Sequence, residues 1–168
     1  MPEHCQTVLF AATMTEAASK LALKFLKNPE RVQIAPDQVT HDLIEQRLHL
    51  ADGLQHKNRL LRYLCADRAV TRAIVFSATK RDAASLAREL TAEGHAAAAL
   101  HADMTQTARN RTVADMRRGK IRLLVATDVA ARGLDITGIS HVINFDLPRS
   151  AEDYVNRIGR TGRAGASG

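Results

Sequence analysis

The chain has 168 residues, of which 45% are apolar and 25% charged, with a formal net charge of +6. This composition predicts a globular protein with a sizeable core and excludes a disordered chain. No apolar run approaches the ~20 residues that a bilayer-spanning helix needs, so we predict no membrane segment. Two widely separated cysteines, Cys5 and Cys65, indicate a reducing, cytoplasmic setting.

The first third of the chain is weakly patterned. Thr7–Phe10 is typical of a short strand, and apolar residues at helical spacing predict a helix over Met14–Lys27 that Asn28-Pro29 ends. A linker follows over Ala35–Gln38, and Leu43–Leu50 is expected to form a strand.

From residue 54 onward, strands and helices alternate strictly. We expect helices over Leu54–Leu64, Lys80–Glu93, Thr105–Arg118 and Asp128–Arg132 and after Ser150, and strands over Ala73–Phe76, Ala96–Leu100, Ile121–Ala126 and His141–Phe145. This alternation predicts right-handed crossovers and a mostly parallel sheet with helices on both faces, a three-layer α/β/α sandwich.

Polar residues follow the predicted strands at the carboxyl ends, where ligands gather in such folds. They are Ser77–Lys80, His101–Asp103, Thr127–Asp128 and Arg132–Asp135. Among them, Asp103 and Asp128 are expected to pair with nearby arginines and hold loops. A run of basic residues, Arg117, Arg118, Lys120 and Arg122, is expected to form a solvated face.

Arg160 and Arg163 lie in a glycine-rich segment after the last predicted helix. Glycine lets this backbone bend tightly, so both guanidinium groups can converge on one small target, and their planar donor sets suit phosphate oxygens. A surplus of basic residues in this part of the chain also favours a phosphate-rich partner, with eleven Lys and Arg against six Asp and Glu between Gln106 and Arg163. The alternative is a solvated basic loop.

These segments resemble the motifs of the DEAD-box RNA helicases. Ala126–Asp135 is similar to motif V, Asn156–Arg163 to motif VI, Ile74–Phe76 with Thr79–Arg81 to motif IV, Gln106 with Arg109 to motif IVa, and Phe10–Thr13 to motif III. The stretch Asp37–Thr40 resembles the bacterial RhlE-like branch. The resemblance implies a RecA-like fold.

The chain departs from the family pattern at three positions: Asn156 replaces the usual histidine of motif VI, Ala11 a serine of motif III, and Ala102 a glycine. The sequence also contains no G-x-x-x-x-G-K-[ST] phosphate loop and no D-E-A-D. We therefore expect a fragment: residues 1–35 as the end of the first RecA-like, ATP-binding domain with the linker, and residues 36–168 as the second RecA-like domain.

The resemblance also implies the roles of individual residues. Arg160 and Arg163 would act as arginine fingers on the γ-phosphate of ATP bound to the first domain, and Gly133 and Asp135 would meet the ribose. The positions that would hold RNA phosphates and 2′-hydroxyls are Thr79, Gln106, Arg109, Thr127 and Arg132. ATP and Mg²⁺ would be held mainly by the first domain, with no metal site in this chain. Taken alone, Thr79 and Gln106 suit a helix cap or a surface position, and Asp135 suits a turn.

The implied function is that of the C-terminal half of an ATP-dependent RNA helicase, inactive by itself. Its partners would be RNA, contacted at the backbone and without sequence preference, and its own first RecA-like domain. Residues 1–35, without the rest of the first domain, are expected to be disordered, to fold back on the second domain or to self-associate with another copy. The alternative is a non-catalytic RNA-binding module that keeps the fold. A DNA helicase is disfavoured, because the R-T-G-R form of motif VI resembles the RNA branch.

Overall fold

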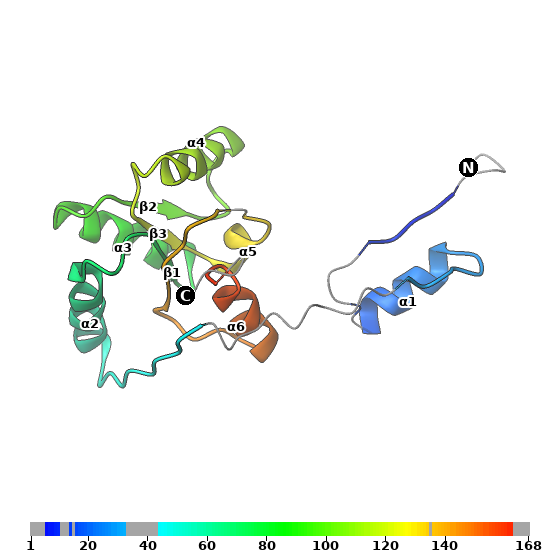
Figure 1. Ribbon diagram of the computed structural model, residues 1–168, viewed down its shortest axis with the longest axis horizontal. Coiled ribbons are helices and arrows are strands. Elements are labelled where there is room, and N and C mark those ends of the chain that lie inside the picture. The colour runs from blue at the N-terminus through cyan, green and yellow to red at the C-terminus, as the bar shows by residue number, and fades with distance from the viewer. Residues whose placement is uncertain (1–5, 11–13, 15, 33–43, 135, 163–168) are drawn as a thin grey trace. The chain divides into compact units, whose positions relative to one another are not determined.

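Figure 1 shows the computed structural model of the chain, which describes residues 6–10, 14, 16–32, 44–134 and 136–162. The chain divides into two compact units, residues 1–37 and residues 38–168. Across the described ranges, no helix combines the length and the apolar character that crossing a membrane requires.

The first unit contains helix α1 (Glu16–Phe25), which is two residues shorter at each end than predicted. Glu16 and Lys20 form an ion pair of 2.6 Å on its surface. Asn28 follows with a left-handed φ of 44°, a conformation that ends helices and that asparagine tolerates. The apolar side chains of Leu23 and Phe25 are 73% and 66% exposed, so neither of them packs into a core.

Both strands predicted in the first third of the chain are wrong. Thr7–Phe10 is irregular and exposed, and so is Leu43–Leu50 over its described residues 45–50. A strand is stable only when a neighbour completes its ladder, and no described strand pairs with either segment. Side chains hold the second segment instead: Ile44 is buried, and the Tyr154 hydroxyl donates to Gln46 Oε1 over 2.5 Å.

From residue 54 onward, the second unit alternates helices and strands as predicted, with each boundary within two residues of its expected place. Its elements are α2 (Leu54–Ala66), β1 (Ala73–Phe76), α3 (Lys80–Ala92), β2 (Ala97–Leu100), α4 (Gln106–Arg117), β3 (Leu123–Ala126), α5 (Asp128–Ala131), β4 (His141–Asn144) and α6 (Ala151–Ile158). The strands form one parallel sheet in the order β2-β3-β1-β4, with Ala73 opposite both Leu123 and His141.

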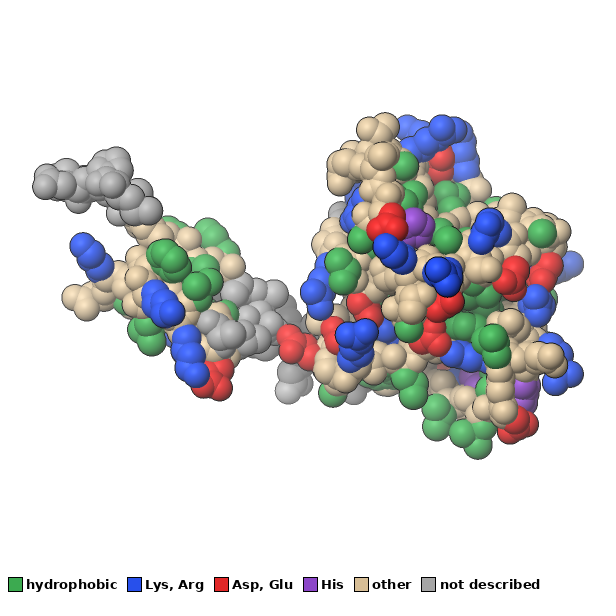
Figure 2. All heavy atoms as spheres, turned by 180° about the vertical axis from the view of Figure 1, so that it is seen from behind, with side chains coloured by type: hydrophobic (Ala, Val, Ile, Leu, Met, Phe, Trp, Pro, Cys, Tyr) green, Lys and Arg blue, Asp and Glu red, His purple; other side chains and the backbone are tan. Residues whose placement is uncertain are grey.

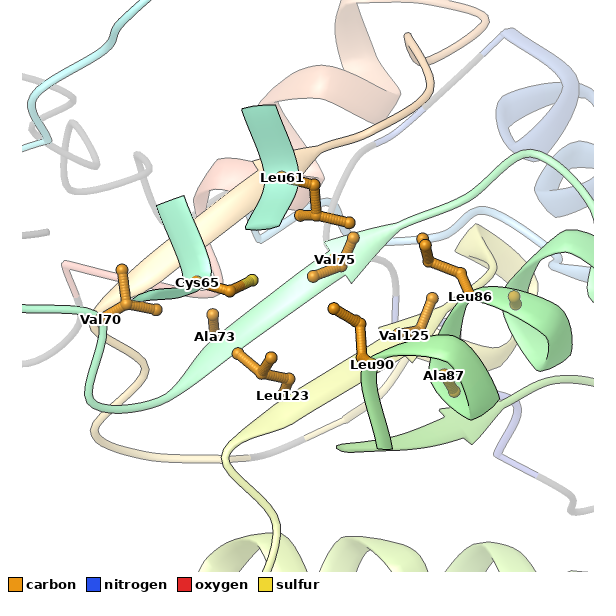
Figure 3. Packing of buried hydrophobic residues seen from close by; sticks show 11 residues of the cluster. Leu61, Cys65, Val70, Ala73, Val75, Leu86, Ala87, Leu90, Leu123 and Val125 are labelled. Carbon is orange, nitrogen blue, oxygen red and sulfur yellow. The ribbon is translucent and has the colours of Figure 1, made fainter. Parts of the chain in front are cut away.

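Helices cover both faces of this sheet. Val75 of β1 packs beneath α2 and α3 with Leu61 and Leu90, as Figure 3 shows, whereas Phe76 belongs to a second cluster with Met116 of α4. Successive side chains of a strand point to opposite faces, so β1 supplies both cores. Every residue of β1 and β3 is buried, as central parallel strands require. The predicted three-layer sandwich with a parallel sheet is confirmed.

Because the strands are parallel, all four end at one edge of the sheet, here called the carboxyl edge, and begin at the opposite amino edge. Three helices that start at the carboxyl edge, α3, α4 and α6, are capped by hydroxyls: Thr79, Thr105 and Ser150 each accept a hydrogen bond from a backbone N–H of the first turn. Gly94 and Gly119, with φ of 90° and 75°, end α3 and α4 in the left-handed conformation that favours glycine. These caps place the helix starts beside the strand ends.

Candidate functional site

A buried arginine organises the carboxyl edge. Arg157 of α6 is only 3% exposed. Its Nε and Nη2 donate to the two carboxylate oxygens of Asp128 over 2.6 and 2.7 Å, and its Nη1 donates to Asn144 Oδ1 over 2.9 Å. The guanidinium lies 4.7 Å from the centre of the Phe76 ring. A buried charge is stable only when paired in this way, so Arg157 fixes α6 against β4 and the start of α5.

Asp146, which follows β4, forms the second group of contacts at this edge. Its carboxylate accepts hydrogen bonds from Lys57 Nζ over 2.5 Å, from the Ala78 N–H over 2.8 Å and from Ser77 Oγ over 3.3 Å. Its carbonyl accepts from Arg157 Nη1 over 2.6 Å. Asp146 therefore contacts elements that are far apart in the sequence, α2, the loop after β1 and α6.

Both carboxylates are held in the ionised form. The hydrogen bonds from Arg157 outweigh partial burial and lower the pKa of Asp128 below its ordinary value. Burial pushes the pKa of Asp146 upward, but the hydrogen bonds from Lys57 and the Ala78 N–H outweigh it, so this pKa is also lowered. The carboxyl edge thus carries fixed negative charges, each matched by a cation.

Arg160 lies just beyond α6, half-buried at the same edge. Its Nη1 donates to the Leu134 carbonyl over 2.8 Å, which connects it to the loop after α5. Gly133 in that loop has a φ of 70°, and a Cβ added there would meet no heavy atom within 4 Å. Backbone conformation, and not crowding within this unit, is therefore what requires glycine at this position.

Arg160 borders a shallow hollow on this edge. Its lining also includes Phe76, Arg132 and Asn156. The hollow has a volume of about 20 Å³, roughly the space of one water molecule. A ligand of nucleotide size would therefore lie on an open surface here and would need a second surface to enclose it.

The residues predicted to contact RNA lie on or near this edge, and the side chains of four of the five make a contact within the chain. Thr79 caps α3 through the Asp82 N–H, and Gln106 Nε2 donates to Asn110 Oδ1 over 2.9 Å. Arg109 Nη2 donates to the carbonyl of Ala130, so it adjoins α5. Thr127 and Arg132 flank the same helix, and Arg132 Nη2 lies 3.6 Å from Asp153 Oδ1. The fold thus gathers Arg109, Thr127 and Arg132 around α5, while Thr79 and Gln106 stand at the starts of α3 and α4.

Two expectations about charged residues need correction. Asp103 pairs with Lys80 at 2.8 Å and not with an arginine, because α3 begins with Lys80 beside the loop after β2. Arg122 is not part of a solvated face: it is half-buried, and its Nη2 donates to the Cys65 carbonyl in the last turn of α2. The remaining basic residues of that run, Arg117, Arg118 and Lys120, are exposed. Figure 2 shows Lys and Arg side chains scattered over the visible face of the second unit, with one group at the top, over α4.

Residues 55–165 match the family described as "Helicase conserved C-terminal domain". The chain belongs to this family. The resemblance to DEAD-box helicases drawn from the motifs is confirmed as well. The chain is 42% identical over its whole length to the DEAD-box ATP-dependent RNA helicase RhpA of Helicobacter pylori (strain B128). Over 99% of its length it is 44% identical to the ATP-dependent RNA helicase RhlB of Vibrio campbellii.

The chain spans 34% and 38% of the lengths of those two relatives, about a third. Among solved structures it resembles S. cerevisiae Dbp5 bound to RNA and ADP BeF3, with a TM-score of 0.83 and 36% identity over the whole chain and 44% of that protein. It also resembles the E. coli DEAD-box protein SrmB bound to regulator of ribonuclease activity A, with a TM-score of 0.65 and 42% identity over 74% of this chain and 75% of that one. These likenesses confirm the RecA-like fold. The RhlE-like branch stays a prediction.

Some predicted site residues of the helicase domain cannot be placed. Arg163 and Asp135 lie outside the described residues, so the convergence of two arginines and the ribose contact of Asp135 stay predictions. The motif III stretch and the linker after residue 32 also lie partly or wholly outside them. Asn156, at the usual histidine position of motif VI, is exposed. Within the described ranges, no three His, Cys, Asp or Glu side chains gather as a metal site would require.

Sequence reasoning missed three residues that organise this edge: Lys57, Asp146 and Arg157. A signal existed for Arg157, because its spacing from Tyr154 and its place beside the apolar Ile158 put it on the inward face of α6. Lys57 and Asp146 are 89 residues apart in the chain, and no local pattern indicates that they meet.

Proposed function

We propose that the chain is the second RecA-like domain of an ATP-dependent DEAD-box RNA helicase, preceded over residues 1–35 by the end of the first. In this proposal, Arg160 and Arg163 approach the γ-phosphate of an ATP molecule held by the first domain. The chain alone neither binds ATP tightly nor hydrolyses it. RNA unwinding requires both domains to close on nucleotide and RNA.

The position of Arg160 carries this proposal. Its side chain is half-buried at the carboxyl edge and donates to the Leu134 carbonyl, and its backbone N–H donates to the carbonyl of Arg157. A guanidinium held in place costs little reorganisation when charge develops on a transferred phosphoryl group. The open hollow beside it encloses almost nothing by itself, which suits a site that a second domain completes.

The nucleotide would otherwise be held mainly by the first domain, together with Mg²⁺. In this domain, Gly133 has a left-handed conformation and an open flank, so its backbone suits close approach by the ribose. Asp135 would accept hydrogen bonds from the ribose hydroxyls. Bound Mg²⁺ would neutralise phosphate charge, and we assign it no ligand in this chain.

RNA would lie along the row of helix starts and strand ends that carries Thr79, Gln106, Arg109, Thr127 and Arg132. Hydroxyl, amide and guanidinium groups suit phosphate oxygens and 2′-hydroxyls. Such contacts recognise the backbone, so binding should be indifferent to base sequence. The RNA-bound state of the Dbp5 structure that this chain resembles is in keeping with such a surface. The cytoplasmic setting remains our proposal from the sparse cysteines.

The test restores the first domain. In the two-domain protein, Arg160→Ala should lower the RNA-stimulated ATPase rate by roughly 10³–10⁵-fold, the range of arginine fingers. RNA affinity without nucleotide should change little. Arg160→Lys should recover little of the rate, because an ammonium keeps the charge but loses the planar donor geometry. Steady-state ATPase measured against RNA concentration gives all three results.

Arg109→Ala is the matched variant on the RNA side. It should raise the RNA concentration needed for half-maximal ATPase while leaving the maximal rate nearly unchanged. Full turnover by Arg160→Ala at saturating RNA would contradict the finger assignment. ATP hydrolysis by the 168-residue chain alone would contradict the proposal that the first domain is needed to hold ATP. A two-domain protein that binds RNA but never hydrolyses ATP would support the non-catalytic module instead.

A further inference from the structure

Asp146 contacts several residues that adjoin different parts of the proposed site. Its backbone N–H donates to the Phe76 carbonyl over 3.0 Å. Its carboxylate accepts from the Ala78 N–H and from Lys57, and its carbonyl accepts from Arg157 Nη1. We call this set of five residues, Lys57, Phe76, Ala78, Asp146 and Arg157, the Asp146 bridge.

The Asp146 bridge has two ends. At one end, Ala78 is the residue before Thr79, which we place on RNA. At the other end, Arg157 is three residues before Arg160, which we place on the γ-phosphate, and the Arg160 N–H donates to the Arg157 carbonyl over 3.1 Å. Asp146 therefore links the loop after β1 to α6 and belongs to neither, in addition to the direct contact between Arg157 and the Phe76 ring.

We propose that Asp146, held by Lys57, positions the loop of Thr79 relative to the turn of Arg160, and so makes RNA binding and nucleotide binding favour each other. This inference rests on the proposed function. Lys57 and Asp146 are positioning residues here, because they act through Ala78 and Arg157 and touch neither ligand.

Lys57 is the part of the bridge that can be removed most cleanly. Its ammonium lies 2.5 Å from Asp146 Oδ1 and 4.2 Å from the centre of the Phe145 ring. The side chains of Lys57 and Asp146 are 31% and 25% exposed, so solvent screens the pair only in part. Without the ammonium, the Asp146 carboxylate keeps weaker, neutral donors and can turn away from Ala78.

The competing explanation is that Lys57 and Asp146 form an ion pair that only stabilises the fold. The chain offers a matched control for it. Arg62, also on α2, binds Glu93 after α3 over 2.6 Å, and these side chains are 41% and 35% exposed. That pair joins α2 to α3 and includes none of the residues of the Asp146 bridge.

The experiment uses the two-domain protein and measures RNA affinity with and without a non-hydrolysable ATP analogue. The ratio of the two dissociation constants is the coupling, typically about 5–150-fold between linked sites. Lys57→Met should reduce this ratio at least about fivefold and raise the RNA concentration for half-maximal ATPase. Arg62→Met should leave the ratio at the wild-type value, and Lys57→Arg should restore most of it. Equal ratios for Lys57→Met and Arg62→Met would overturn the proposal.

A second measurement does not depend on ATPase activity, so it can also be made on variants that are less stable. In the 168-residue chain, adding a single-stranded oligouridylate should shift the amide resonance of Arg160 in the wild type and in Arg62→Met. The shift should be lost in Asp146→Asn, and its persistence there would overturn the proposal. Failure of the proposed function has a different signature, because Arg160→Ala would then leave ATPase unchanged whatever the Lys57 variants do.

Discussion

Cations hold both edges of the sheet, but their partners differ. At the amino edge, Arg122 Nη2 donates to the Cys65 carbonyl and Arg72 Nη1 donates to the Thr137 carbonyl over 2.8 Å. At the carboxyl edge, Arg157 binds Asp128 and Lys57 binds Asp146. Neutral carbonyls accept weaker hydrogen bonds than carboxylates do. The amino edge is therefore held by hydrogen bonds to neutral backbone carbonyls, whereas the carboxyl edge holds ionised groups in fixed positions.

Burial sharpens this difference. Arg157 is 3% exposed, and its guanidinium nitrogens reach Asp128, Asn144 and the Asp146 carbonyl. Arg122 is only half-buried, yet its Nε is buried without a hydrogen-bond partner among the described residues. At the carboxyl edge every nitrogen of the Arg157 guanidinium donates a hydrogen bond, whereas at the amino edge the buried Nε of Arg122 donates none among the described residues.

The largest effect should follow from removing Arg157. Arg157→Met leaves Asp128 and Asn144 without their donor, and breaking a buried ion pair costs about 3–5 kcal/mol. We expect the low end of that range, because Asp128 keeps 29% of its side chain exposed. Urea unfolding measures the loss. Adding Asp128→Asn to the same variant should recover part of it, and an additive double variant would contradict the pairing argument.

The equivalent change at the amino edge should cost less. Arg122→Met removes the hydrogen bond to Cys65 and a cation at the C-terminus of α2, together with the unsatisfied Nε. A net loss of about 1 kcal/mol follows from these opposing terms. The same urea series tests it, with Arg72→Met as a companion. If Arg122→Met cost as much as Arg157→Met, the comparison between the edges would fail.

Variants of two helix N-caps at the carboxyl edge distinguish an effect on stability from an effect on RNA binding. Thr79→Ala and Thr105→Ala each remove a hydroxyl that accepts from a first-turn N–H, so each should lower the free energy of unfolding by about 1 kcal/mol. Only Thr79→Ala should also weaken RNA binding, measured by titration with single-stranded RNA at fixed salt. Equal loss of RNA affinity in both variants would show that Thr79 acts only as a helix cap and does not contact RNA.

The smallest effect concerns acid. The pKa values of Asp128 and Asp146 are lowered in the folded state, so their contribution to stability is present above the unfolded pKa of about 4 and is lost as pH falls through the folded pKa. Asp128→Asn should be less stable at pH 7 but should lose less on going from pH 5 to pH 3. Arg122→Met should keep the wild-type acid sensitivity, since its partner does not titrate. Unfolding measured at each pH distinguishes them.

Sequence alone predicted the second unit well because its signals are local. Ala73–Phe76 is a continuous apolar run, Thr79 and Ser150 are recognisable caps, and Gly94 follows a helical pattern. Each of these depends on the chemistry of a few neighbouring residues. The strand predicted over Leu43–Leu50 failed because a strand needs a partner, and pairing is decided by distant parts of the chain.

The residues of the candidate site also fall into those that the local sequence indicated and those that it did not. Residues that follow strands were found, because a parallel sheet brings every strand end to one edge. Arg160 was predicted as a site residue because glycines flank it, and Arg157 was not. Arg157 is the buried residue, and its partners Asp128, Asn144 and Asp146 are not adjacent to it in the sequence. Arg122 was wrongly predicted to be exposed, because a run of basic residues usually lies on the surface. In the structure, the Cys65 carbonyl in the last turn of α2 accepts a hydrogen bond from it.

The sheet order has a consequence for synthesis. Ala73 pairs with Leu123, 50 residues further along the chain, and β2, which comes next after β1 in the sequence, does not pair with it. At about 5–20 residues per second, β1 waits roughly 2.5–10 seconds on the ribosome before β3 exists. During that time a four-residue strand that is fully buried in the finished domain has only α2 and α3 to cover one of its faces. Codons that slow translation between β1 and β3 would lengthen this exposure, so aggregation during expression should be most sensitive to elongation rate in that interval.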